Sequence, residues 1–149
     1  MVPAGNLNRH RMSTRHTQTL MNVHFMAVRD NWKTPKATYE ILNNEFKFDF
    51  DPCPPNPQFD GLSVEWGFSN FVNPPYGNVI NLWLVKARQE QSKGKLSVML
   101  IPSRTDTRWW HDHAMSANEI RFIKGRLKFD DHKNSAPFPS AILVFRPIT

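Results

Sequence analysis

The sequence has one cysteine, no long apolar run and no acidic residue before Asp30. A lone cysteine, Cys53, excludes a disulfide within the chain and makes a reducing cytoplasm the expected compartment. No stretch approaches the ~18 apolar residues of a membrane span, and the polar N-terminus lacks the apolar core of a signal peptide. With 149 residues, 40% of them hydrophobic, the chain is expected to form one globular domain.

The lack of acidic residues leaves residues 1–29 strongly basic, within a chain of net charge +6. Residues 1–28 also lack apolar periodicity, so we predict a flexible basic arm there and a folded domain over residues 29–149. A second basic cluster lies late in the chain and comprises Arg121, Lys124, Arg126, Lys128 and Lys133. Such clusters are typical of solvated surfaces and of surfaces that contact phosphates, and charge alone leaves both interpretations open.

Apolar periodicity predicts alternating helices and strands. Helices are expected over residues 35–45, after residue 78 and after residue 107, the first with Thr34 as its N-cap and Pro35 at its first position. Strands are expected at residues 46–51, 69–72, 96–101, 119–123, 126–129 and 141–146. The strands at 119–123 and 126–129 flank Lys124-Gly125, which indicates a hairpin. This order indicates an α/β fold with a mostly parallel sheet and an antiparallel C-terminal hairpin and strand.

The motif Asn73-Pro74-Pro75-Tyr76 follows the strand predicted at 69–72, where open α/β sheets place their ligands. The Asn73 side chain offers an acceptor and donors. Pro74 offers a carbonyl without an N–H, and Pro75 favours an extended Pro74, which directs that carbonyl. Two acceptors beside the flat ring of Tyr76 suit the planar exocyclic amine of a nucleobase. The alternative is an ordinary proline-rich turn.

Several other segments, together with this motif, resemble one known family. The chain is similar to the small phage-type DNA N6-adenine methyltransferases, which use S-adenosylmethionine. The resemblance covers roughly residues 30–147 and rests on Trp32-Lys33-Thr34-Pro35, Phe50-Asp51-Pro52-Cys53, Asp60-Gly61-Leu62, Asn73-Pro74-Pro75-Tyr76-Gly77, Arg104-Thr105-Asp106-Thr107, 121–129 and 136–140. It implies a Rossmann-like methyltransferase sheet and, for a phage-encoded protein, the cytoplasm of the host.

The resemblance also implies how the motif acts on DNA. Asn73 and the Pro74 carbonyl would accept hydrogens from the adenine N6 amine, which favours charge development on that nitrogen during transfer. Pro75 would orient the Pro74 carbonyl, and Tyr76 would stack on the base. In duplex DNA the adenine must first be flipped out of the helix. No metal is needed.

The expected cofactor-binding residues come from two stretches. Trp32, Thr34 and Pro35 resemble the segment that contacts the methionine end of the cofactor. Asp51, at the end of a predicted strand, can take its ammonium group. Cys53 is expected to be a small packed residue or a cofactor neighbour rather than a nucleophile. Asp60 or, alternatively, Glu65 can hold the ribose hydroxyls, although both fit ordinary exposed acids equally well.

The segment between Asp51 and Asn73 departs from a complete nucleotide-binding fold. No glycine-rich loop follows Asp51, so the dinucleotide fingerprint is absent. Residues 52–72 are too few for two β-α units, whose crossovers need a dozen or more residues each. We therefore expect an abbreviated sheet, with thin cofactor walls or walls supplied by a second copy in a homodimer.

The remaining predictions concern DNA contacts and competing functions. Arg104, Arg126 and Lys128 are expected to contact DNA. His111 and His113 are two residues apart and would point about 200° apart on a helix, which argues against a shared metal. Three alternative functions stay open: methylation of RNA adenine, methylation of protein glutamine, and DNA binding without catalysis.

Overall fold

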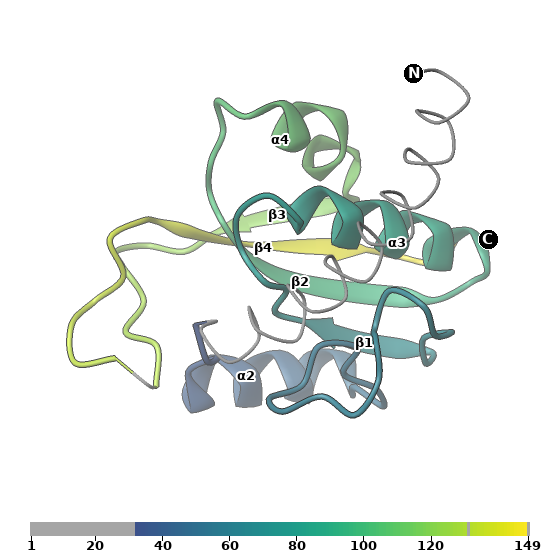
Figure 1. Ribbon diagram of the computed structural model, residues 1–149, viewed down its shortest axis with the longest axis horizontal. Helices are drawn as coiled ribbons and strands as arrows, with labels where there is room; N and C mark the ends of the chain where they lie inside the picture. The colour runs from purple at the N-terminus through teal and green to yellow at the C-terminus, as the bar shows by residue number, and fades with distance from the viewer. Residues whose placement is uncertain (1–31, 131, 149) are drawn as a thin grey trace, which may run out of the picture.

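The computed structural model describes residues 32–130 and 132–148, so the predicted arm at residues 1–28 lies outside the described part. Its elements, drawn in Figure 1, are α2 (Lys36–Phe46), β1 (Ser69–Val72), α3 (Ile80–Ser92), β2 (Leu96–Pro102), α4 (Arg108–Asp112), the short 3₁₀ helix η1 (Ala114–Ser116), β3 (Glu119–Phe122) and β4 (Ser140–Phe145). Within the described residues, no helix has the length and apolar character that crossing a membrane requires.

The strands form one mixed sheet in the order β1-β2-β4-β3. β1 and β2 run parallel and are joined by α3, whereas β4 is antiparallel to both β2 and β3. The α/β class is confirmed, but the prediction of a mostly parallel sheet is wrong. In the described part of the chain, α3 is the one helix that joins two parallel neighbours, and β4 returns between β2 and β3 in the opposite direction.

The strand predicted at residues 46–51 is reduced to one isolated parallel bridge, between Phe50 and Asn70. Lys47 adopts a left-handed conformation at the end of α2, with φ 52°. Asp51 and Pro52 follow the bridge directly, and a proline cannot donate to a ladder. The alternation of apolar and charged side chains was therefore not enough to form a strand, because the backbone at either end of this segment leaves space for only one bridge. Residues 51–68, all described, contain no helix or strand, as expected of an abbreviated sheet.

The hairpin predicted around Lys124-Gly125 is also absent. β3 ends at Phe122 and pairs with β4, not with residues 126–129. Gly125 does make a turn, with φ +75°, but the chain then enters a loop. Phe129 is fully buried there, and the Leu127 carbonyl accepts from the Ala136 N–H at 2.8 Å. Burial of Phe129 therefore directs this segment inward, away from the sheet edge.

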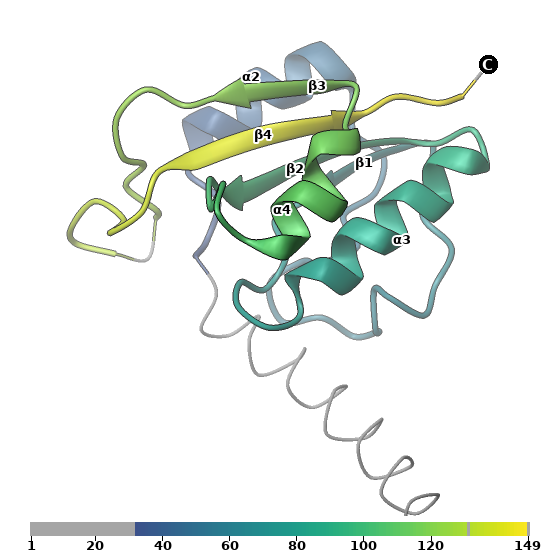
Figure 2. The ribbon, with the colours of Figure 1, turned by 90° about the horizontal axis from the view of Figure 1, so that it is seen from above.

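Helices cover both faces of the sheet, with α2 on one face and α3 and α4 on the other (Figures 1 and 2). Side chains alternate accordingly along β2, where Val98 and Leu100 pack on the α2 side and Met99 and Ile101 on the α3 side. α3 buries an apolar face at helical spacing, formed by Ile80, Trp83, Leu84 and Ala87. Because both faces are covered, the central strands β2 and β4 are apolar apart from the buried Ser97 and Ser140, as is typical of sheets buried on both sides.

One edge of the sheet gathers the loops that matter for function. β1 and β2 end there together, since Val72 pairs with Met99 in parallel register. β4 begins there, opposite Pro102, and β3 ends there, opposite Ala141. The loop that follows β1, the loop that follows β2 and the segment 123–139 between β3 and β4 therefore meet at this edge, which we call the loop edge.

Candidate active site

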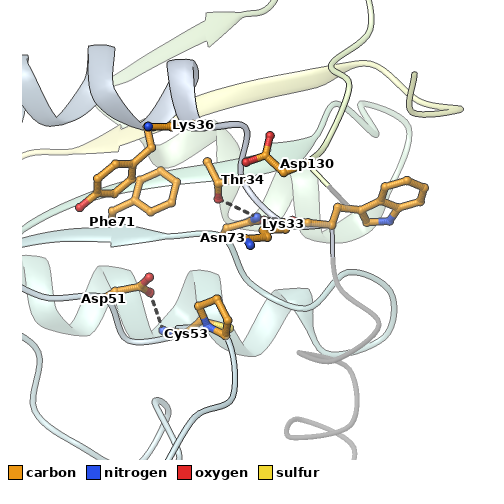
Figure 3. Close-up of a pocket in the computed structure, with 11 residues that line it drawn as sticks. Lys33, Thr34, Lys36, Asp51, Cys53, Phe71, Asn73 and Asp130 are labelled. Atoms are coloured by element: carbon orange, nitrogen blue, oxygen red, sulfur yellow. Dashed lines mark hydrogen bonds between the residues drawn. The ribbon is translucent and has the colours of Figure 1, made fainter. Parts of the chain in front are cut away.

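A pocket of about 410 Å³ lies at the loop edge, beside the N-terminal end of α2 (Figure 3). The structure brings five of the predicted site residues together in it: Trp32, Thr34, Asp51, Cys53 and Asn73. These residues come from three segments far apart in the sequence. Asn73 follows β1, the segment 32–34 precedes α2, and Asp51 follows the bridge between Phe50 and Asn70, which together bring the three segments to this edge.

Asn73 follows β1 directly and is only 6% exposed. Its side-chain Nδ2 donates to the backbone carbonyl of Trp32 and, at 3.0 Å, to Oγ1 of Thr34. The Asn73 amide thus ties the end of β1 to the segment 32–34. The predicted N-cap role of Thr34 is wrong: Pro35 occupies that position, and no side chain caps α2. The Thr34 hydroxyl faces Asn73 instead.

Asp51 and Cys53 line the pocket from the irregular loop that begins after Phe50. Oδ1 of Asp51 accepts from the Cys53 N–H at 2.9 Å. Burial raises the pKa of the Asp51 carboxyl to about 6, against the opposing effect of that hydrogen bond. Burial, assisted by the Asp51 charge, also raises the pKa of the Cys53 thiol. A thiol that stays protonated is a poor nucleophile, which supports a packing role for Cys53.

The rest of the motif is packed into the protein. Pro74 and Pro75 are buried. The Tyr76 hydroxyl donates to the Leu100 carbonyl at 3.3 Å, and its ring forms a T-shaped pair with Phe138 at a centroid distance of 5.6 Å. Burial raises the pKa of Tyr76. Tyr76 packs against the apolar clusters on both sides of the sheet, so its position is fixed by the core.

Three other predicted cofactor contacts lie outside the lining of this pocket. The Pro35 carbonyl accepts from the Tyr39 N–H at 3.0 Å. Asp60 accepts from the Leu62 N–H and the Ser63 hydroxyl, which stabilises a local turn. Glu65 pairs with two lysines between α3 and β2, Lys93 at 3.8 Å and Lys95 at 3.2 Å.

Sequence reasoning missed several residues of the lining: Lys33, Lys36, Tyr39, Pro55, Phe71 and Asp130. Lys33 lies inside a motif that was recognised, and Tyr39 and Phe71 fall within the helix predicted over residues 35–45 and the strand predicted at residues 69–72. No local sequence pattern marks Asp130 as a pocket residue, because it lies in segment 123–139, far along the chain from the other lining residues. Its N–H donates to the Lys33 carbonyl at 3.2 Å, and His132 stacks on Trp32 at 3.8 Å. The late segment thereby supports the wall formed by residues 32–34.

The predicted DNA-contacting residues are all exposed at the loop edge. Arg104 follows β2 and lines a second hollow together with Gly77, Asn78, Pro102 and Trp109. Arg126 and Lys128 lie on segment 123–139, as do Lys124 and Lys133, all exposed. Arg121 does not belong to this group, because it is held by Glu45 and Glu119 in ion pairs of 2.6 and 2.5 Å.

The two histidines considered for a metal have separate surroundings. Nε2 of His111 lies 2.7 Å from the Thr105 carbonyl, and Nδ1 of His113 lies 3.1 Å from Arg88. Among residues 32–130 and 132–148, no group of three or more His, Cys, Asp or Glu side chains is placed to hold a metal ion.

Comparison with known proteins identifies the family of this chain. A family model described as DNA N-6-adenine-methyltransferase (Dam) matches residues 22–148. A protein of Haemophilus phage HP1 (strain HP1c1) named DNA N-6-adenine-methyltransferase is 26% identical over 138 residues, covering 80% of each chain. A protein of Escherichia phage T1 with the same name is 27% identical over 117 residues, covering 70% of this chain and 49% of the relative. The chain thus spans about half the length of the T1 protein.

Proposed function

Because the chain belongs to the Dam family of DNA N-6-adenine-methyltransferases, we propose that it transfers a methyl group from S-adenosylmethionine to the N6 amine of adenine in DNA. The observation that carries the proposal is the convergence of Asn73, Asp51 and the segment 32–34 on one pocket. Two phage relatives that carry this activity in their names support it.

The residues of the pocket fit the proposed cofactor. Its volume of about 410 Å³ lies within the usual range of small-molecule sites. Asp51 can pair with the cofactor ammonium, and Lys33 and Lys36 can pair with its carboxylate. Tyr39 and Phe71 supply apolar aromatic surface. When bound, S-adenosylmethionine supplies an electrophilic methyl group.

The motif residues act on the adenine. The oxygen of the Asn73 amide and the Pro74 carbonyl accept the two hydrogens of the N6 amine, which stabilises positive charge as it develops on nitrogen. Pro75 orients the Pro74 carbonyl, and the ring of the half-buried Tyr76 stacks on the flipped base. Tyr76 suits this role because its hydroxyl is anchored to Leu100 and its ring to Phe138.

DNA approaches the loop edge in this proposal. Arg104, Arg126 and Lys128 contact phosphates, and the hollow that Arg104 lines with Trp109 lies just beyond the motif. The enzyme flips the target adenine from a duplex, at a cost of a few kcal/mol. The sheet is a Rossmann-like methyltransferase sheet shortened to one parallel pair, and a homodimer completes the cofactor wall beside residues 51–68.

The proposal is tested by incubating the protein with methyl-labelled S-adenosylmethionine and adenine-containing duplex DNA, followed by digestion of the DNA to nucleosides. We expect the label in N6-methyladenine. Label in cytosine, or in protein alone, would contradict the proposal, and equal or better labelling of RNA would favour an RNA substrate. If titration detects no binding of S-adenosylmethionine, the proposed activity is ruled out and the alternative of DNA binding without catalysis is favoured.

A further inference from the structure

Both hydrogens of the Asn73 amide are directed at one short segment. Nδ2 donates to the carbonyl of Trp32 and to Oγ1 of Thr34. A carbonyl oxygen can only accept a hydrogen bond. The amide atom that faces Trp32 must therefore be the nitrogen, since the flipped amide would set two carbonyl oxygens against each other. The environment thus decides the orientation of the side chain.

The segment 32–34, which binds the Asn73 amide, is itself fixed by neighbouring residues. Pro35 restrains Thr34 to extended conformations, and the Thr34 hydroxyl takes no part in capping α2. On the other side, the Asp130 N–H donates to the Lys33 carbonyl, and Trp32 is packed against His132 and Phe138. The two acceptors that meet Asn73 are therefore fixed in place before any ligand arrives.

We propose that Thr34 is a positioning residue, which acts with the Trp32 carbonyl to present the Asn73 amide to the substrate only as an acceptor. This inference rests on the proposed function. With both amide hydrogens bound, Asn73 has no donor for the keto oxygen of guanine or thymine, whereas its oxygen suits an amine. Thr34 thereby contributes to selection of an amino base through Asn73, without touching that base.

The same geometry explains why this position carries asparagine. An Asn73→Asp variant would replace the donating nitrogen by an oxygen that faces the Trp32 carbonyl, and an ionised carboxylate has no hydrogen to offer. We expect this variant to lower kcat about as strongly as removal of the side chain, although it retains an acceptor for the amine.

The test compares Thr34→Ser, which keeps the hydroxyl, with Thr34→Ala, which removes it. We expect the serine variant to keep kcat near that of the wild type and the alanine variant to lose about tenfold, the rate equivalent of one hydrogen bond of about 1.4 kcal/mol. The dissociation constant of S-adenosylmethionine, measured by titration, should be alike in both. In NMR spectra the side-chain amide signals of Asn73 should shift in the alanine variant and stay in place in the serine variant.

The outcomes separate this inference from the proposed function. If the wild type forms no N6-methyladenine, the proposed function fails, while the Asn73 signals still report whether Thr34 holds the amide. If the wild type is active and Thr34→Ala keeps its kcat, the positioning role is overturned. A variant that loses cofactor affinity while its kcat at saturation is unchanged would show Thr34 to be a cofactor contact instead. Thr34→Val, close to threonine in shape, serves as a second hydroxyl-free variant should the alanine variant unfold.

Discussion

At the scale of single residues, the proposed reaction depends most on the amide of Asn73. An Asn73→Ala variant should lose roughly 10²–10³-fold in kcat, the usual cost of removing one group that stabilises transition-state charge. The dissociation constant of S-adenosylmethionine should change little, because Asp51 and the two lysines remain. Single-turnover methylation assays and cofactor titration measure the two quantities.

Asn44, which is exposed on α2, provides the matched control for this substitution. Asn44→Ala should retain full activity. An Asn73→Ala protein that is folded and methylates DNA at the wild-type rate would remove Asn73 from the mechanism.

Asp51 makes stability depend on pH in a defined direction. Its pKa is raised from 3.8 to about 6 by burial, so the folded state binds this proton more tightly than the unfolded state does. The resulting contribution to the free energy of unfolding is full below pH 4 and is lost as pH rises through about 6. Asp51→Asn should therefore stabilise the protein at pH 7.5, by on the order of 1–3 kcal/mol, and should change little at pH 4.

Urea unfolding of Asp51→Asn and the wild type at both pH values checks this prediction. Equal stabilisation at pH 4 and pH 7.5 would show that titration of Asp51 is not the cause.

The Asp51 carboxyl should also make cofactor affinity depend on pH. We expect affinity for the cationic cofactor to fall as pH drops below about 6, because a protonated Asp51 no longer attracts the ammonium.

At the scale of elements, Glu90 of α3 joins the helix to the irregular segment 51–68. Its side chain is fully buried, accepts from the Trp66 N–H at 3.1 Å, and pairs with Lys86, Lys93 and Lys95 at 3.2–3.3 Å. Burial alone would raise the pKa of Glu90, but these hydrogen bonds lower it to about 2. Its contribution to stability is therefore present at neutral pH and is lost as pH falls from about 4.5 toward 2.

A Glu90→Ala variant should lose about 3–5 kcal/mol of unfolding free energy, because Lys86 and the Trp66 N–H lose this buried carboxylate. Of their ion pairs, Lys93 and Lys95 keep only those with Glu65. The matched control is Glu40→Ala, since Glu40 forms an i,i+4 pair with Lys36 at 3.9 Å on the exposed face of α2. That exposed pair should contribute less than about 1 kcal/mol. Urea denaturation at pH 7 measures the unfolding free energy of both variants. Similar losses in Glu90→Ala and Glu40→Ala would mean that burial does not decide how strongly an ion pair stabilises the protein.

The elements that the sequence predicted well are those with strong local patterns. α3 followed from apolar residues at helical spacing, and β1, β2 and β4 from short apolar runs. Residues 46–51 and 126–129 also had strand-like patterns and did not form strands. Whether they formed strands depended on whether a partner strand lay beside them. In residues 126–129, Phe129 is instead buried against the α2 side of the sheet.

At the scale of the whole molecule, positive charge gathers where the proposed chemistry occurs. Replacing Arg126 and Lys128 together by glutamine should weaken DNA binding and reduce the slope of log affinity against log salt by about 2, roughly 1 for each phosphate that the variant no longer neutralises. Lys47→Gln is the control, because Lys47 ends α2 near the start of β1, away from the loop edge.

Fluorescence binding titrations over a range of salt concentrations measure these slopes. An unchanged slope in the double variant, or an equal change in Lys47→Gln, would argue against the loop edge as the DNA-binding face. Cofactor affinity should be the same in all three proteins, because none of these side chains lines the pocket.

The sequence by itself determined the family of this protein, because residue types carry their own donors, acceptors and charges. Asn-Pro-Pro-Tyr after a strand suited a planar amine, the segments at 32–35 and 50–53 resembled those of DNA N6-adenine methyltransferases, and the family match confirms that family. The tertiary structure decided how those groups are oriented. It turned Thr34 from a helix cap into a partner of Asn73, and it brought Asp130 against Lys33. Such pairings join residues tens of positions apart, so they depend on how the chain packs and leave no periodic signal along it.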